Sequence, residues 1–431
     1  MNLFCRRLAI LSLFIFLFSS TALATTVLAI DYGSDFIKAS LIKPATPFDV
    51  LLDKDSKRKI RSSVAWKNGE RLFGQDAFNI VRATLLRIKT LANRPGLGSH
   101  VLQATRFPKD SYNSLKYLLG VPANADVVSY YTSFSPLSVV PSTRFTASVH
   151  GSSGVSAGEK GAVPATWDVE VLVAMQLAYI RGLALDAAGR GERVQDVVVT
   201  VPAFFSQFER DAIADAVELA GLRLLAFVND GAAVAVNYAM TRQFPQQERH
   251  IVYDAGAGST RATIATFTMQ GKKQDATLIT INGVGYDRLA GGTELDRRLR
   301  EILVGEFESK HGVRIRDDPK AMMKLWKEAE RIKAILSANT EASARVRLAL
   351  PFVWGVIVLL MVLPKVESVY DDIDFSMKVT RQAFEDICTD MKLRFVQPIY
   401  DALDSANLTL VCVYLMRYAN ILLKSGVDRR T

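Results

Sequence analysis

Two stretches in opposite halves of the chain follow the same pattern, and this repetition limits the possible folds more than any other feature. Residues 250–268 read as a buried strand that ends at Asp254, a turn with two glycines and two hydroxyl residues, and a second strand. Residues 26–41 repeat this plan around Asp31. One glycine-rich hairpin is most often only a turn. Two copies predict two similar lobes that face a single ligand.

The residue types in both turns suit a phosphate group. Glycine lacks a Cβ and adopts positive φ readily, so backbone N–H groups at Gly256 and Gly258 can approach an anion, and Ser259 adds a hydroxyl donor. The carboxylate before such a turn is expected to hold Mg²⁺ through water, because Mg²⁺ keeps several waters and takes one or two carboxylates. Neither turn opens a helix or continues into Gly-Lys-Ser/Thr, which excludes a P-loop.

Length and composition place the chain among ordinary globular proteins. With 431 residues, 49% hydrophobic and 23% charged, it is long enough for two or three domains with their own cores. The net charge of +9 is scattered along the chain. The densest basic run, residues 54–61, contains no interleaved aromatic residues, so we interpret it as a solvated loop and expect no nucleic-acid partner.

The N-terminus has the pattern of a secretory signal. Arg6 and Arg7 precede an apolar run at 8–18 and an Ala-x-Ala ending at Ala24, which predicts a signal peptide at 1–24 that is cleaved after about Ala24. An uncleaved anchor is the alternative, although the apolar run is short for a membrane span. The two cysteines that follow, Cys388 and Cys412, do not form a disulfide framework.

The middle of the first half predicts alternating strands and helices. Residues 196–201 read as a strand covered on both faces. Ser206 and Glu209 form a capping box for a helix that ends near Gly221. A second buried strand, 224–228, places Asp230 at its C-terminal end, where α/β folds carry function. A small-residue helix is expected over 232–240.

The second half predicts a turn at 283–285, followed by two helices. Gly291 and Gly292 precede the first, whose free N–H groups make a plausible anion site. The second helix, 322–337, has Glu330, Lys333 and Ser337 on one face. A solvated charged face would show the same pattern.

Several of these stretches resemble one family. Residues 200–205, 219–222 and 228–235, together with the two Asp turns, are similar to the ATPase domain of the heat-shock-protein-70 superfamily over roughly 26–410. The Asn-Asp-Gly sequence at 229–231 and the signal peptide resemble its large endoplasmic-reticulum branch, the glucose-regulated or hypoxia-upregulated chaperones. This resemblance implies an α/β, actin-like ATPase with two RNase-H-like lobes around a nucleotide cleft. Lobe I would span 25–243 and lobe II 244–410, the second lobe being incomplete.

The resemblance also implies roles for individual residues, with ATP and Mg²⁺ as cofactors. In phosphoryl transfer the protein mainly positions groups and neutralises charge, so a metal, a lysine and backbone donors suffice. The matching positions are Lys116 and Asp230 for catalysis, Asp31 and Asp254 for the metal, Gly33, Ser34, Asp35, Gly256, Gly258 and Ser259 for the phosphates, and Glu330, Lys333 and Ser337 for the adenosine side, with Gly291 and Gly292 nearby.

Three positions depart from the family pattern. Asp35 replaces a threonine of the first turn, and its charge is expected to weaken phosphate binding unless a cation compensates. Arg261 replaces an acid after the second turn, and Ala334 replaces an arginine that stacks on adenine. These changes leave nucleotide binding in place but predict that hydrolysis is not fast, so whether the chain is an active ATP hydrolase stays open.

Two segments do not fit the family pattern. Residues 347–365 form the most apolar stretch. It has marginal length for a transmembrane span, but its removal joins 342–346 to 367–375 in the family pattern. Our hypothesis is a retained intron, with no stable membrane span. Residues 411–431 read as a divergent tail without a retrieval signal. We expect the second lobe to be open, with strands lacking partners, and the chain to be poorly stable and unable to couple ATP to client binding.

The favoured function is that of an ATP-binding molecular chaperone in the endoplasmic-reticulum lumen, which assists folding and translocation of unfolded client polypeptides. The alternative is a non-hydrolysing nucleotide exchange factor for the lumenal chaperone BiP. A sugar kinase of the same fold is less supported because no sugar-site signature is present. Asn407 begins a glycosylation sequon, a marker of lumenal exposure.

Overall fold

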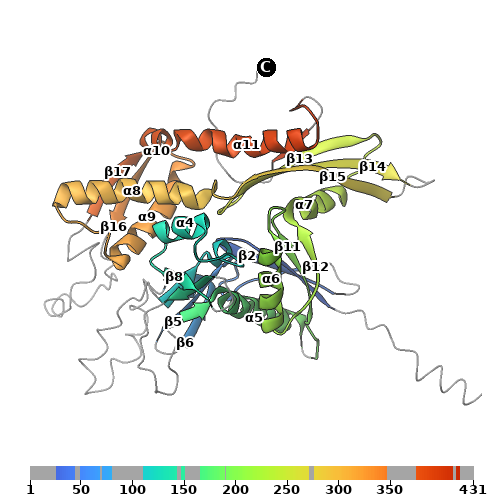
Figure 1. Cartoon of the computed structure of the whole chain (residues 1–431), viewed down its shortest axis with the longest axis horizontal. Coiled ribbons are helices and arrows are strands. Elements are labelled where there is room, and N and C mark those ends of the chain that lie inside the picture. The colour runs from blue at the N-terminus through green and yellow to red at the C-terminus, as the bar shows by residue number, and fades with distance from the viewer. Residues whose placement is uncertain are drawn as a thin grey trace, which may run out of the picture.

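The computed structural model describes residues 26–43, 49–67, 70–79, 110–142, 147–150, 166–189, 191–270, 276–346, 375–410 and 414–417. The expected signal peptide (1–24), the apolar segment (347–365) and most of the tail lie outside the described residues. The described chain forms two lobes, each a sheet with helices against it (Figure 1). The two-lobed α/β architecture agrees with the expected actin-like fold.

Lobe I is built on a mixed sheet in the order β12-β11-β1-β2-β3, with β4 also paired to β2. β1 runs parallel to β11 and antiparallel to β2, which makes β1–β2 the first Asp hairpin. Two small sheets, β6-β5-β7 and β10-β9-β8, complete the lobe. The strands are β1 Val27–Tyr32, β2 Phe36–Ile42, β3 Asp49–Val50, β4 Ile60–Arg61, β5 Ser63–Lys67, β6 Glu70–Phe73, β7 Ser111–Asn113, β8 Ser138–Pro141, β9 Ala147–His150, β10 Thr166–Asp168, β11 Asp196–Val201 and β12 Arg223–Asn229.

The two helices predicted in lobe I, Gln207–Leu219 and Asp230–Ala239 in the structure, begin and end close to the predicted positions. The capping box is confirmed: the Ser206 hydroxyl accepts from the Glu209 N–H at 3.4 Å, and the Glu209 carboxylate accepts from the Ser206 N–H at 2.7 Å. Gly221 follows the end of that helix with a φ of 72°. The helices are α2 Gly74–Phe78, η4 Leu115–Tyr117, α4 Asp126–Phe134, α5 Val169–Ala188, α6 Gln207–Leu219 and α7 Asp230–Ala239.

Lobe II contains an antiparallel sheet, β15-β14-β13, extended by β18, and a smaller part in which α8 and α9 pack against β16-β17. β13 and β14 form the second Asp hairpin. The elements are β13 Glu248–Ala255, β14 Thr260–Gln270, β15 Ala276–Asp287, α8 Gly292–His311, α9 Pro319–Leu336, β16 Glu341–Val346, β17 Phe375–Thr380, α10 Arg381–Ile387, α11 Thr389–Ser405 and β18 Tyr414–Arg417.

The predicted turn at 283–285 is wrong. Both glycines lie inside the long strand β15, and α11 crosses directly over them (Figure 1). A Cβ on Gly283 would stand 2.3 Å from the Ala402 carbonyl oxygen, and one on Gly285 would stand 2.1 Å from the Pro398 carbonyl oxygen. The glycines therefore allow close packing of a helix on the sheet.

The expectation that strands of the second lobe lack partners does not hold at β13. Tyr414–Arg417, within the stretch interpreted as a divergent tail, forms β18 and runs parallel to β13. Its register places Tyr414 opposite His250 and Arg417 opposite Tyr253. This pairing covers the edge of the strand that leads to the second phosphate turn.

The hypothesis that residues 347–365 are a retained intron stays a prediction. β16 and β17 are antiparallel neighbours, and the pairing continues to the last described residues on either side, with Val346 opposite Phe375. The two described ends of the interruption thus face each other in one sheet.

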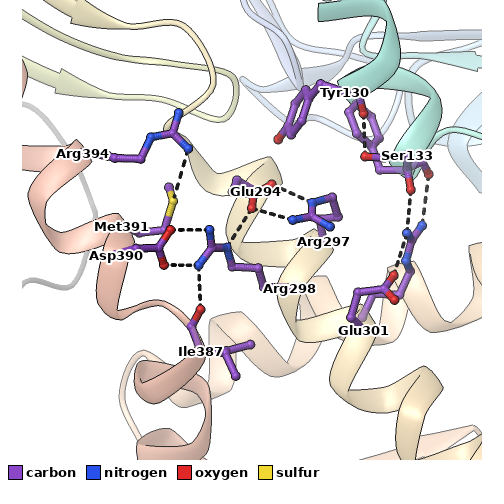
Figure 2. A network of polar contacts seen from close by, with 12 residues as sticks. Tyr130, Ser133, Glu294, Arg297, Arg298, Glu301, Ile387, Asp390, Met391 and Arg394 are labelled. Carbon is purple, nitrogen blue, oxygen red and sulfur yellow. Dashed lines mark hydrogen bonds and ion pairs between the residues drawn. The ribbon is translucent and has the colours of Figure 1, made fainter. Parts of the chain in front are cut away.

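Helix α8 connects the two lobes (Figure 2). Toward lobe I, the Arg300 guanidinium donates to the carbonyl oxygens of Ser133 at 2.8 Å and Phe134 at 3.3 Å, at the end of α4. Within lobe II, Arg298 binds Asp390 of α11 at 2.7 Å. The α4–α8 contact fixes one wall of the space between the lobes.

One helix of the described chain, α5, is long and apolar enough by composition to cross a membrane. Within that stretch, 44% of the residues are buried inside the protein. α5 packs on β2, β5 and α6, as a core helix of lobe I does.

Candidate functional site

The two Asp hairpins meet at one cavity of about 990 Å³ between the lobes. The first hairpin contributes Gly33, Ser34 and Asp35, and the second contributes 254–259 and Arg261. A Cβ on Gly258 would stand 2.4 Å from the Ser34 Oγ. The two turns therefore approach each other as closely as their side chains allow, as expected for loops that share a ligand.

The glycines of these turns allow neighbouring groups to come close to the backbone, and they do not provide an unusual backbone conformation. Gly256 and Gly258 do not use the positive φ that is open to glycine, since the positive-φ glycines of the described chain lie elsewhere. Gly33 is needed because a Cβ would stand 2.4 Å from the Phe36 carbonyl oxygen.

The expected free N–H groups at the start of α8 are not free. The Gly292 N–H donates to the Gly256 carbonyl at 3.0 Å, and the Thr293 N–H donates to the Ala257 carbonyl at 2.9 Å. Gly291, as N-cap, also packs against Ala257. These contacts hold the second phosphate turn in place, which corrects the direct anion-binding role expected of Gly291 and Gly292, although Gly292 still lines the cavity.

The first candidate metal ligand, Asp31, is already paired. Its carboxylate binds the Lys38 ammonium at 2.7 Å and accepts from the Thr200 hydroxyl at 3.1 Å. Burial acts to raise the pKa of Asp31, but the Lys38 ion pair, the Lys116 charge and the Thr200 hydrogen bond together hold that pKa below its usual value.

The second candidate ligand, Asp254, shares one arginine with Asp230. The two outer nitrogens of Arg261 bind the two carboxylates, Nη1 to Asp230 and Nη2 to Asp254. All three side chains line the cavity, and the Arg261 side chain is 14% exposed. Burial raises the pKa of Asp230 despite the opposing charges of Arg261 and Lys116. The position flagged as a departure from the family pattern therefore carries the central cation of the site.

Lys116 lies where a catalytic lysine was expected. Its ammonium donates to the Tyr32 carbonyl at 2.6 Å, next to Asp31, and lies 5.6 Å from the centre of the Phe205 ring. Burial and the nearby positive charge of Arg261 lower the pKa of Lys116 to about 8. Lys116 and Arg261 thus repel each other, and the nearby carboxylates of Asp31, Asp230 and Asp254 oppose that effect at Lys116.

Asp35 lies near a cation that compensates its negative charge. The Arg61 guanidinium lies 3.8 Å from the Asp35 carboxylate and 2.5 Å from Glu330, which joins the first phosphate turn to helix α9. Burial raises the pKa of Glu330 against the pull of Arg61. Glu330 faces Arg61 and is not among the residues that line the cavity, so its contact with adenosine stays a prediction.

The other residues expected on the adenosine side line the cavity. Lys333, Ala334 and Ser337 line the cavity beside Arg381. The Lys333 ammonium binds Asp296 at 2.5 Å and the Gly292 carbonyl at 3.0 Å. Burial raises the pKa of Asp296 to about 7.

These pairings do not suit a metal held by protein carboxylates. Asp31 is bound by Lys38, and Asp230 and Asp254 are bound by Arg261. Within the part of the chain that the structure describes, no cluster of three or more His, Cys, Asp or Glu side chains could hold a metal ion. Mg²⁺ requires near-octahedral oxygen ligands, and here the carboxylates face nitrogen cations.

Comparison with known proteins agrees with the two-lobed fold. The profile of the Hsp70 protein family matches residues 100–414. The chain belongs to the Hsp70 family. Members of this family bind ATP, and the two-lobed fold expected from the sequence is the fold of the family. The Hsp70 match reaches past Leu410, where the resemblance was expected to stop, and ends in β18.

Curated Hsp70 relatives cover most of this chain. It is 34% identical to heat shock protein 70 homolog lhs1 of Schizosaccharomyces pombe over 90% of this chain and 40% of the relative. It is 34% identical to hypoxia up-regulated protein 1 of Xenopus laevis over 93% of this chain and 55% of the relative, and 33% identical to the Homo sapiens protein of that name over 89% and 34%. The chain therefore spans about a third to a half of these relatives. The name of the Xenopus laevis and Homo sapiens relatives matches the hypoxia-upregulated branch that the motifs indicated.

Proposed function

We propose that this chain is the nucleotide-binding part of an endoplasmic-reticulum chaperone of the Hsp70 family, and that its cleft binds ATP and ADP. The observation that carries the proposal is the meeting of two Asp hairpins, one from each lobe, at a single cavity that is also lined by the half-buried Lys116. A cavity of about 990 Å³ has the size of a small-molecule site.

The residues that line the cavity suit different parts of a nucleotide. Lys116, Ser34 and Ser259 offer an ammonium and two hydroxyls to phosphate oxygens. Lys333 and Ala334 of α9 and Ser337, its C-cap, also line the cavity, and the small side chain of Ala334 leaves room for adenosine.

Calorimetric titration of the full chain with ATP and ADP tests this function. We expect saturable binding of one nucleotide, weakened about tenfold or more in a Lys116→Ala variant, since charge-assisted hydrogen bonds contribute about 1.5–3 kcal/mol. Arg316→Ala is the matched control: it removes a cation that binds Glu301 and Glu308 and does not line the cavity. No saturable heat in the wild type, or equal affinity in Lys116→Ala, would contradict the proposal.

The proposed compartment is the endoplasmic-reticulum lumen, which the signal-peptide pattern at 1–24 supports. Asn407 is exposed at the end of α11 and has a φ of 52°. Translation in the presence of microsomes should therefore give a glycosylated product, and Asn407→Gln should remove the glycosidase-sensitive shift. A product that stays unglycosylated and protease-accessible would contradict lumenal placement.

A second candidate, a non-hydrolysing nucleotide exchange factor for BiP, is favoured by Arg261. A guanidinium between Asp230 and Asp254 occupies the carboxylates that would otherwise position a metal and the attacking water. Single-turnover hydrolysis by this chain, and ADP release from BiP in its presence, separate the two functions. Faster ADP release with no detectable hydrolysis supports exchange, whereas hydrolysis without any effect on BiP supports a self-contained ATPase.

A further inference from the structure

We infer that Arg261 is a tethered cation that takes the place of a divalent metal at the second phosphate turn, so that this chain binds adenine nucleotides equally well with and without Mg²⁺. The inference rests on the nucleotide binding proposed above and adds its cation requirement.

The backbone fixes the position of Arg261. It lies on β14 directly opposite Asp254 of β13 in the antiparallel register, and facing residues of such a pair have their Cβ atoms about 5 Å apart. The third member, Asp230, is the first residue of α7, and Gly231 presses against Thr263 of β14, two residues beyond Arg261. Strand pairing and helix packing therefore bring one guanidinium to two carboxylates.

The two outer nitrogens of the guanidinium bind both carboxylates at the same time. Nη1 binds Asp230 and Nη2 binds Asp254, a geometry that a planar guanidinium provides and an ammonium does not. Because Arg261 lines the cavity, the same cation also faces the space assigned to the phosphates. The guanidinium therefore lies next to two carboxylates and the phosphate site, which is the position that a bridging metal would take.

The local charges are balanced without a metal. Three carboxylates, Asp31, Asp230 and Asp254, are matched by three cations, Lys38, Lys116 and Arg261, all of which line the cavity. A divalent ion bound to Asp230 and Asp254 would have to displace Arg261 and leave a largely buried guanidinium unpaired. Removing one partner of a buried ion pair is strongly destabilising, so the metal competes poorly for these ligands.

Titration of the full chain with ATP in Mg²⁺ buffer and in EDTA tests the inference. We expect the wild-type Kd to change by less than about threefold between the two buffers, a difference below about 0.7 kcal/mol. Arg261→Ala should bind at least about tenfold more weakly in EDTA than in Mg²⁺, a gap of about 1.4 kcal/mol. Arg261→Lys keeps a positive charge and should fall between them, and Arg316→Ala should behave as the wild type.

Mn²⁺ alone, without nucleotide, gives an independent readout by electron paramagnetic resonance. The wild type should leave the signal of free Mn²⁺ unchanged, whereas Arg261→Ala should reduce it because Asp230 and Asp254 are released. A wild type that needs Mg²⁺ for tight ATP binding would overturn the tethered-cation inference and leave the proposed function standing. A wild type that binds no nucleotide in either buffer would overturn both.

Discussion

Replacing Arg300 by methionine should loosen the contact between the lobes at a measurable free-energy cost. Arg300 is on α8, its side chain is 4% exposed, and its guanidinium donates to two carbonyl oxygens at the end of α4. These carbonyls have no partner within the helix ladder, and a positive charge at a helix C-terminus is additionally favourable. Methionine keeps much of the side-chain volume and removes both the donors and the charge.

The magnitude follows from the contacts. A hydrogen bond from a charged group contributes about 1.5–3 kcal/mol, and the longer Phe134 contact lies at the lower end. The Arg300 guanidinium also lies 5.4 Å from the centre of the Trp326 ring, which adds about 0.5–1 kcal/mol. Burial lowers the pKa of Arg300, so removing the charge recovers some desolvation energy. The net loss in unfolding free energy should be about 3 kcal/mol.

Urea denaturation and hydrogen exchange of the α4 segment measure this loss. The control is Arg316→Ala, whose pairs with Glu301 and Glu308 are on the surface and contribute about 0–1 kcal/mol each. We expect a clearly lower urea midpoint and faster exchange at the end of α4 for Arg300→Met, with little change for the control. Equal midpoints for the two variants, or unchanged exchange at α4, would refute the assigned role of this contact.

Three other predictions concern the cavity. Gly258→Ala should weaken ATP binding about tenfold, because the new Cβ meets Ser34 Oγ. A Gly258→Ala/Ser34→Gly double variant should bind more tightly than Gly258→Ala but more weakly than the wild type, because it relieves this contact and also loses the Ser34 hydroxyl; no gain over Gly258→Ala in titration would argue against the close approach. ATP affinity should fall as the pH rises through about 8, because Lys116 loses its proton there; Lys116→Arg should remove this fall between pH 7 and 9, and a similar fall in that variant would rule out Lys116 as its source. Arg61→Ala should weaken ATP binding by leaving Asp35 uncompensated, and Asp35→Ala in the same chain should recover it, as titration can show.

Features set by neighbouring residues could be predicted from the sequence. The capping box at Ser206 and Glu209 depends on residues three positions apart. The two Asp hairpins were found from strand patterns and short turns, and the structure brings them to one cavity. The motif resemblance placed Lys116 there as well.

Features that depend on residues far apart in the sequence could not be predicted from it. Arg61 and Glu330 are 269 positions apart, and nothing in either stretch indicates the other. Gly283 and Gly285 give the same signal whether they form a turn or accommodate a crossing helix, and only the position of α11 distinguishes the two. Arg261 was recognised as unusual, but its pairing with Asp230 depends on how α7 packs on β14.

Helix α8 links the second phosphate turn to the outer parts of both lobes. Its first N–H groups hold the second phosphate turn, Arg298 holds α11, and Arg300 holds α4. A helix of 20 residues is about 30 Å long and bends little over that span. A ligand that displaces the turn by a fraction of an ångström would therefore also displace contacts about two turns further along the helix, so the occupancy of the cleft can alter residues that the nucleotide never touches.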